Sequence, residues 1–398
     1  MSQQISIQIE AAKQISPHEE LGIIRAAFAR NPSGLMRERL VGLLSLADAF
    51  DEIVQLLSNA SDLSFWEAIM LAQACFARES RSDDECARAA AERALRGAGT
   101  NAEMATALAT RAKAEIRLGD TSAARATLRD ALKLDPRNID ACKRSVALEL
   151  AAGNIEELLE LLDELAAAGA AHSRLFVGRA LAHARAGDVA AAARDIGFDA
   201  FARVDELTAP AGWSSTESFN AALAEELLAH PGLRYERYGT ASELTWRIDA
   251  PATGDAHCVR LLLDQLSSRI RAHLDSIAPV DHPWVNARPK DALLRSWCVI
   301  TDSDGYETWH VHHFGWLSGV YYVQVPDSIA TGTGEEGCLA FGLPPDLAGA
   351  SAAEAFGIEL VRPRAGMMMA FPSHAYHRTF PHATGEKRIC VAFDLRPL

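Results

Sequence analysis

The sequence predicts a multidomain α + β protein, in which an N-terminal α-helical solenoid is followed by a C-terminal β-sheet barrel with flanking helices. Two observations carry this prediction. In the N-terminal half, glycines recur every 34 residues, at Gly119, Gly153 and Gly187, in a background rich in Ala, Leu, Arg and Glu. Beyond residue 290 the apolar residues instead alternate with period two, as they do in β-strands with one buried face.

Bulk composition limits the classes of partner and compartment. The 398 residues are 49% hydrophobic and carry a formal charge of −14. Because binding to nucleic acid requires a basic face and no run of Lys or Arg stands out, we expect no nucleic-acid partner. No run of about 18 apolar residues and no basic n-region occur, so neither a membrane span nor a secretory signal is predicted. Seven scattered cysteines without a C-x-x-C spacing suit free thiols in a reducing compartment, and we expect a cytoplasmic protein.

The N-terminal half has helix–turn–helix punctuation. Each of the three glycines ends an apolar-periodic stretch and is followed by a polar residue that opens the next helix. A period of 34 residues is typical of tetratricopeptide repeats, and residues 101–137 form the clearest unit. Stacked repeats form a solenoid with a concave face, so we expect the array to bind a peptide or protein. The alternative is that it only packs on the rest of the chain or forms a homodimer.

The joint between the two halves lies near residues 207–216, where Pro, Gly and four hydroxyl residues fall within ten positions. We therefore expect a repeat domain over residues 1–205 and a barrel domain over residues 206–398. The barrel domain should open with two flanking helices, one over about 217–229 and one ending before Pro279.

The remaining sequence predicts eight short strands, which suit a double-stranded β-helix of the jelly-roll or cupin type. They are expected over residues 293–301, 306–313, 317–325, 337–342, 357–361, 366–371, 374–380 and 386–395.

Three histidines in this region are candidate metal ligands. His310 and His312 are two apart in a predicted strand and so point to the same face, and His377 supplies a third imidazole. Iron(II) in oxygenases takes a facial set of three protein ligands, most commonly two His and one carboxylate. Here His312 stands where that carboxylate is expected, and the neighbouring His313 competes with it as a ligand. The alternative is that His310 and His312 are partly buried strand residues without a metal. No catalytic side chain is predicted beyond the metal site.

Arg388 is the candidate for binding a carboxylate co-substrate. Guanidinium is planar and always charged, and it grips a carboxylate with two parallel hydrogen bonds. Arg388 alternates with the apolar residues that follow it, so its side chain should point away from them. Ser318, Tyr321 and Tyr322 are candidates for an accompanying hydroxyl. The alternative is a surface arginine that pairs with Glu386 or Asp394.

Two sequence blocks together resemble a known family. The first contains Thr308-Trp-His310-Val-His312 and Leu317-Ser-Gly-Val-Tyr-Tyr-Val323, and the second contains Pro363-Arg-Ala-Gly-Met-Met-Met-Ala-Phe-Pro-Ser373, His377 and Lys387-Arg-Ile389. They are similar to the H-x-H…LSGVYY stretch and the closing motif of 2-oxoglutarate/Fe(II)-dependent oxygenases of bacteria and phages. The resemblance covers residues 215–398. It implies Fe(II) at His310, His312 and His377, and 2-oxoglutarate at Arg388, aided by Ser318 or Tyr322.

The expected function is therefore an Fe(II)- and 2-oxoglutarate-dependent dioxygenase that hydroxylates a peptide or protein side chain, with the repeats aiding substrate recruitment. Two alternatives stay open at this point. One is a three-His iron dioxygenase that uses no 2-oxoglutarate. The other is a non-catalytic repeat scaffold whose degenerate cupin-like barrel serves as an interaction module.

Overall fold

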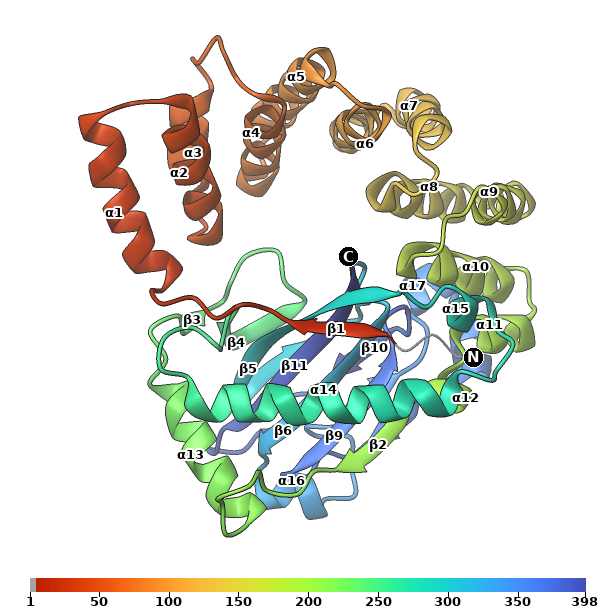
Figure 1. Ribbon diagram of the computed structural model, residues 1–398. Coiled ribbons are helices and arrows are strands. Elements are labelled where there is room, and N and C mark those ends of the chain that lie inside the picture. The colour runs from red at the N-terminus through yellow and green to blue at the C-terminus, as the bar shows by residue number, and fades with distance from the viewer. Residues whose placement is uncertain (1–4) are drawn as a thin grey trace. The chain divides into compact units, whose positions relative to one another are not determined.

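The computed structural model describes residues 5–398. Contacts group these residues into two units, whose helices and strands are labelled in Figure 1. One unit comprises residues 17–170, and the other comprises residues 171–398 together with the described residues up to Ser16. No helix in the described part of the chain is both long enough and apolar enough to cross a membrane.

The unit of residues 17–170 is a helical array in which successive helices pack on one another. Its helices are α1 (Pro17–Arg30), α2 (Gly34–Leu46), α3 (Phe50–Leu57), α4 (Phe65–Arg78), α5 (Arg81–Gly97), α6 (Asn101–Arg117), α7 (Thr121–Leu134), α8 (Ile139–Ala152) and α9 (Ile155–Ala167). Figure 1 shows them as consecutive helical hairpins. The predicted tetratricopeptide-like solenoid is therefore confirmed.

The turns of this array follow from local sequence. Gly119 and Gly153 adopt φ of +90° and +78°, a left-handed conformation that residues with a Cβ rarely adopt. Polar side chains cap several helices of the array, although Asn154, which follows Gly153, forms no side-chain cap bond. Asp120 accepts the backbone N–H of Ala123, and Asn138 accepts that of Ala141. Fully buried alanines along α6 allow the neighbouring helices to approach closely.

The second unit is built on two β-sheets. The large sheet has the order β2-β9-β6-β11-β5-β4-β3, with β1 added in parallel alongside β5, and the small sheet has the order β10-β7-β8. The strands are β1 (Ser6–Ile9), β2 (Arg203–Glu206), β3 (Arg234–Tyr235), β4 (Ser242–Ile248), β5 (Asp291–Glu307), β6 (Leu317–Gln324), β7 (Leu339–Phe341), β8 (Glu359–Val361), β9 (Met367–Pro372), β10 (His377–Thr379) and β11 (Arg388–Pro397). Together the two sheets form the predicted double-stranded β-helix.

One predicted strand is wrong in a way that matters for the site. The strands expected over 293–301 and 306–313 are instead one continuous strand, β5, which ends at Glu307. Residues 308–313 are irregular apart from a single bridge between His310 and His377. Their aromatic and β-branched composition resembles that of a strand, but they pair with the neighbouring segment only at alternate residues.

Helices cover the outer face of the large sheet, so the inner face is left to form a cavity. The flanking helices are α13 (Thr216–Leu228) and α14 (His257–Ile277), as predicted, and Figure 1 shows α14 running across the strands. The Tyr321 hydroxyl donates to the side chain of Asn220 in α13 at 2.8 Å. Tyr321 thus faces outward, while its neighbour Tyr322 faces inward. Beyond α14 this unit also contains the short helices α15 (Pro283–Asn286), α16 (Asp327–Thr331), α17 (Pro345–Ala348) and α18 (Ala350–Phe356).

The boundary predicted between residues 205 and 206 falls within the second unit, inside β2. Helices α10 (Ser173–Arg185), α11 (Val189–Ile196) and α12 (Phe198–Phe201) continue the repeat pattern, with Gly187 at φ +85°. Nevertheless α10 and α11 pack on the short helices of the barrel unit. The Ser173 hydroxyl also donates to the carbonyl of Gly315 in that unit. The boundary expected from the sequence therefore marks the end of the repeat pattern. The boundary between the two units defined by contacts marks the point where the helices begin to pack on the barrel.

A cluster of three arginines around one carboxylate predicts an acid-sensitive contribution to stability. Asp249 accepts from Arg234, Arg237 and Arg247 at 3.1, 2.7 and 2.8 Å. Burial alone would raise the pKa of Asp249, but Arg247 and Arg237 lower it to about 2. Because the pKa is lower in the folded state than in the unfolded state, this contribution is complete above about pH 4 and is lost as the pH falls toward about 2.

We therefore expect Asp249→Asn to cost roughly 2 kcal/mol of unfolding free energy near neutral pH. The difference from wild type should shrink below about pH 4. Thermal unfolding followed by circular dichroism across this pH range measures it, and a difference that stays constant into acid would contradict the assignment.

Candidate metal centre

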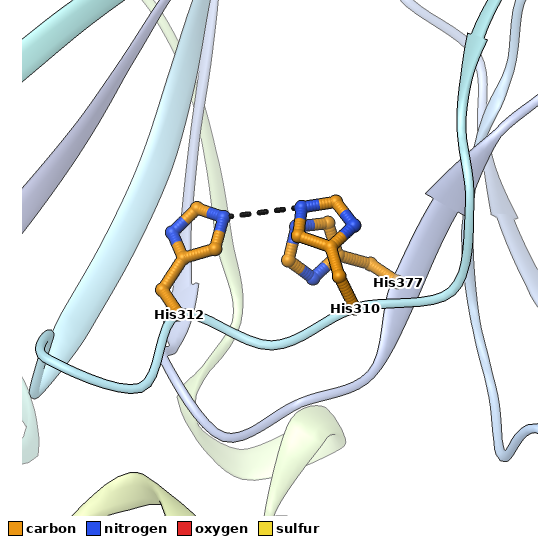
Figure 2. A group of neighbouring side chains, drawn as sticks. All are labelled: His310, His312 and His377. Carbon is orange, nitrogen blue, oxygen red and sulfur yellow. Dashed lines mark hydrogen bonds between the residues drawn. The ribbon is translucent and has the colours of Figure 1, made fainter. Parts of the chain in front are cut away.

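Three histidines meet where residues 308–313 run beside the start of β10. His310 and His377 exchange both backbone hydrogen bonds, at 3.0 and 3.1 Å, and the N–H of His312 donates to the carbonyl of Ser373 at 2.9 Å. Residues paired in this way, and residues two apart, point to the same side. Figure 2 shows the three rings gathered around one point. One ligand atom from each lies within 4.8 Å of those of the other two.

The second nitrogen of each ring fixes its tautomer. Every Nδ1 lies within hydrogen-bond distance of an oxygen that can only accept, so each Nδ1 carries the proton and each Nε2 has a free lone pair. These contacts are His310 Nδ1 to the carbonyl of Thr308 at 2.8 Å, His377 Nδ1 to the carbonyl of Ala375 at 3.0 Å, and His312 Nδ1 to Oδ1 of Asp394 at 2.6 Å.

The lone pairs suit a bound metal ion. The Nε2 atoms of His310 and His312 are 3.3 Å apart, the contact dashed in Figure 2. Two lone pairs at this distance repel each other unless a cation lies between them. Two imidazole nitrogens at right angles on one ion, with bonds of about 2.1 Å, would lie about 3 Å apart. Imidazole is a good ligand for iron, so the donor set fits a divalent transition metal.

Burial favours the neutral form that binds metal. It lowers the pKa of His377 well below the usual value, and the neighbouring His310 and His312 lower it further. Burial also lowers the pKa of His310, with a smaller contribution from His312. A metal can therefore bind near neutral pH without first displacing protons from these two rings.

Arg388 lies on the wall of the same cavity without a carboxylate partner. It is 3% exposed, and its Nη1 donates to the carbonyl of Gly337 at 2.7 Å. Its Nη2 lies 3.4 Å from the Thr379 hydroxyl, and its buried Nε has no acceptor. Neither Glu386 nor Asp394 pairs with it, and no ion pair to Arg388 occurs within residues 5–398. A buried, unpaired guanidinium is costly, so this cavity suits an anionic ligand.

One cavity is lined both by histidines of the cluster and by Arg388. Its lining includes His312, His377 and Arg388 together with Tyr322 and Thr379. The β-sheet register explains this arrangement, because Arg388, Cys390 and Asp394 alternate on β11 and point to the inner face, as Tyr322 does on the adjacent β6.

Comparison with known proteins agrees with this geometry. Residues 295–394 match the model of a family described as "Putative 2OG-Fe(II) oxygenase", where 2OG is 2-oxoglutarate. These residues form a 2OG-Fe(II) oxygenase domain. The match begins within β5 and ends on β11, so it includes His310, His312, His377 and Arg388. The family description names the same metal and co-substrate that the sequence predicted.

Three solved structures that resemble this chain are 15% to 20% identical to it in sequence. A prolyl-4-hydroxylase from Pseudomonas putida is 16% identical and aligns over 50% of this chain and 93% of its own, with a TM-score of 0.33. HygX from Streptomyces hygroscopicus, solved with nickel and 2-oxoglutarate, is 15% identical over 50% and 83%, with a TM-score of 0.30. A tetratricopeptide repeat protein from Parabacteroides merdae is 20% identical over 45% and 71%, with a TM-score of 0.35. No curated protein matches the sequence.

Sequence reasoning considered Asp394 only as a partner of Arg388 and missed its contact with His312. Besides its contact with His312, Asp394 accepts the Ser318 hydroxyl at 2.8 Å and lies 3.3 Å from Nη2 of Arg396. Burial alone would raise the pKa of Asp394, but His312, Arg396 and Ser318 lower it to about 2. The signal in the sequence was its position, since Asp394 follows Arg388 by six residues on one strand and therefore shares its face.

The predicted hydroxyl groups of the oxygenase domain lie in different places. Tyr322 lines the cavity, and burial raises the pKa of its phenol, which stays protonated. Ser318 instead contacts Asp394 and the Ser373 hydroxyl. The hydroxyl that Arg388 contacts is that of Thr379 on β10, which sequence spacing did not indicate.

His313 lies outside the histidine cluster, although sequence left it as a rival to His312. Its ring packs on exposed Phe314, with 4.1 Å between ring centroids. The reason is alternation, because His313 follows His312 directly and points to the opposite side.

A further acidic side chain, Glu307, lines the cavity at the end of β5. Burial alone would raise the pKa of Glu307, but the nearby His310 and Arg247 hold it below its usual value. Arg247 in turn lies over the ring of Trp297, which contacts His312 edge-on. The lining of the cavity thus carries charges of both signs, on Glu307 and Arg388.

Proposed function

We propose that this chain is an Fe(II)- and 2-oxoglutarate-dependent dioxygenase that hydroxylates a side chain of a peptide or protein. One observation carries the proposal: a single cavity brings together converging imidazole lone pairs and a buried guanidinium without a carboxylate partner. His310, His312 and His377 would hold the iron, and Arg388 would hold the distal carboxylate of 2-oxoglutarate. When bound, the iron supplies the chemistry that couples decarboxylation of 2-oxoglutarate to succinate with oxidation of the substrate.

The side chains around Arg388 prepare it for a dicarboxylate. The contacts of Arg388 with Gly337 and Thr379 fix the guanidinium plane, while its Nε is left without an acceptor. Tyr322, protonated and facing the cavity, supplies a hydroxyl that donates to the same ligand. The aliphatic walls, which include Val299 and Leu339, exclude water and strengthen the ion pair.

Both alternatives leave one feature without a role. A three-His dioxygenase without a co-substrate gives no reason for an unpaired buried arginine. A metal-free interaction module gives no reason for the lone-pair contact between His310 and His312. The dioxygenase reading accounts for both.

The peptide or protein substrate is proposed from the architecture. A tetratricopeptide-like solenoid presents an extended surface that suits a chain more than a small metabolite. Under this proposal, α1–α9 recruit the substrate to the barrel. Homodimer formation by the chain is a separate point to test. None of the seven cysteines forms a disulfide, in keeping with the cytoplasmic location we propose.

Succinate production tests the dioxygenase directly. Purified protein supplied with Fe(II), ascorbate and 2-oxoglutarate should form succinate slowly without substrate, and His377→Ala should form none. If wild type with full iron occupancy produced no succinate, even with a panel of acidic, basic and neutral peptides, the proposal would fail.

A role of the repeats in recruitment predicts a separation of kinetic constants. Excising residues 17–170 and joining their ends by a flexible linker should spare uncoupled decarboxylation and raise the KM for a peptide substrate at least tenfold. This excision keeps β1 and α10–α12, which belong to the barrel unit, whereas removal of residues 1–205 would also delete β2 from the edge of the large sheet. An unchanged KM would indicate that the repeats have only a structural role.

A further inference from the structure

We propose that Asp394 is a positioning residue for the metal. Its carboxylate, bound to His312, gives a three-histidine site the negative charge that a two-His, one-carboxylate site receives from a direct ligand. The inference rests on the proposed function only in that His310, His312 and His377 bind a divalent metal.

The contact between Asp394 and His312 has the geometry of a charge-assisted hydrogen bond. Nδ1 of His312 and Oδ1 of Asp394 are 2.6 Å apart, and Asp394 is 2% exposed. The Ser318 hydroxyl donates to the same oxygen, and Arg396 lies beside the other. Both carboxylate oxygens are therefore engaged, so the carboxylate is held in one orientation toward the imidazole.

The surrounding backbone leaves little freedom for movement. Gly315 passes so close that a Cβ at this position would stand 3.2 Å from Cγ of Asp394. The neighbouring main chain is pinned as well, because the N–H of His312 donates to the carbonyl of Ser373. The carboxylate and the ring are thus packed as one unit.

The three ligands are not equivalent. His310 and His377 direct their Nδ1 protons to neutral backbone carbonyls, whereas His312 directs its proton to a carboxylate. A carboxylate acceptor makes the imidazole more basic at Nε2 and fixes its orientation. His312 is also the residue two positions after His310, where the commonest set has a carboxylate ligand. The Asp394 carboxylate therefore places a negative charge on the side of the site where the commonest set has its carboxylate ligand. The difference is that the His312 imidazole ring lies between this carboxylate and the metal.

The pairing of Asp394 with Arg396 does not by itself explain this arrangement. Arg396 Nη2 is 3.3 Å from Oδ2, a longer contact than that with His312, and the buried Nε of Arg396 has no acceptor. A carboxylate placed only for Arg396 would be expected to satisfy that nitrogen as well.

Metal affinity of the full chain tests the proposal without any turnover. Asp394→Asn keeps an oxygen for the Nδ1 proton but removes the charge, and it should bind Co(II) about 10- to 100-fold more weakly in a chelator-competition titration. Asp394→Ser is a second uncharged variant with a smaller side chain, and the same loss is expected, so either one that folds is decisive. Asp302→Asn is the matched control, because Asp302 pairs with Lys387 in an exposed contact, and its affinity should equal that of wild type.

A second readout separates charge from packing. In the iron-loaded protein, loss of the nearby negative charge should shift the Fe(III)/Fe(II) midpoint potential to a more positive value, since the ferric form carries more charge. A residue that only supports the fold would lower Tm and leave the potential unchanged.

The outcomes distinguish the two levels of proposal. If wild type binds no Co(II) or Fe(II), the proposed function itself fails. If wild type binds metal and a folded Asp394 variant matches it in affinity and in potential, the positioning role of Asp394 is overturned and the proposed function stands.

Discussion

Replacing His377 by alanine is expected to abolish stoichiometric iron binding while the protein stays folded. His377 is buried at the start of β10 and supplies one of the three ligand atoms that lie within 4.8 Å of one another. Two imidazoles on an open cavity hold iron much more weakly than a facial set of three. Iron content after anaerobic loading and desalting measures the effect, and circular dichroism reports folding. His310→Ala should behave in the same way.

The matched control for these variants is His313→Ala. His313 is adjacent to His312 in sequence but lies outside the cluster, so this variant should retain about as much iron as wild type. Full iron occupancy in His310→Ala and His377→Ala would remove the histidines from the metal site. Loss of iron in His313→Ala alone would show that the ligand set had been assigned to the wrong neighbour.

Replacing Arg388 by alanine is expected to weaken 2-oxoglutarate binding by two orders of magnitude or more, with iron still bound. Removing one partner of a buried charge pair typically costs about 3–5 kcal/mol, because the other charge is left without compensation. Lysine keeps the charge but not the planar fork, so Arg388→Lys should fall between wild type and Arg388→Ala. Titration of 2-oxoglutarate into the anaerobic iron complex measures all three affinities.

Arg364→Ala is the control for the loss of a positive charge. Arg364 forms an exposed ion pair with Glu206 and belongs neither to the histidine cluster nor to the cavity lining, and surface pairs contribute little. Its affinity for 2-oxoglutarate should equal that of wild type. Equal affinity in Arg388→Ala would exclude Arg388 from the co-substrate site and revive the three-His dioxygenase without 2-oxoglutarate.

Features with a local period could be predicted from sequence. The 34-residue spacing of Gly119, Gly153 and Gly187 predicts helix–turn–helix units, because each glycine takes a left-handed turn that other residues avoid. The alternation of Arg388 with apolar neighbours placed its side chain on the inner face, where the structure has it. The two-residue spacing of His310 and His312 likewise predicted that both side chains point to the same side, even though their segment is not a regular strand.

Features that depend on distant partners could not be predicted. Strands β1 and β2 are four residues each and exist only because they add to edges formed by β5 and β9. Thr379 reaches Arg388, and Asp394 reaches His312, through pairings across the barrel rather than along the chain. An acidic residue on a mostly buried strand is a usable signal, because a buried carboxylate requires a partner. That signal identifies Asp394 without identifying the partner.

The central claim is that one cavity holds both an iron ion on three histidines and 2-oxoglutarate on Arg388. The most direct test is the visible absorbance of the anaerobic wild-type protein as Fe(II) and then 2-oxoglutarate are added. We expect a charge-transfer band that requires both additions, saturates at about one iron per chain and is absent from His377→Ala. Wild-type protein that binds no iron, or that binds iron but develops no band in excess 2-oxoglutarate, would contradict the claim.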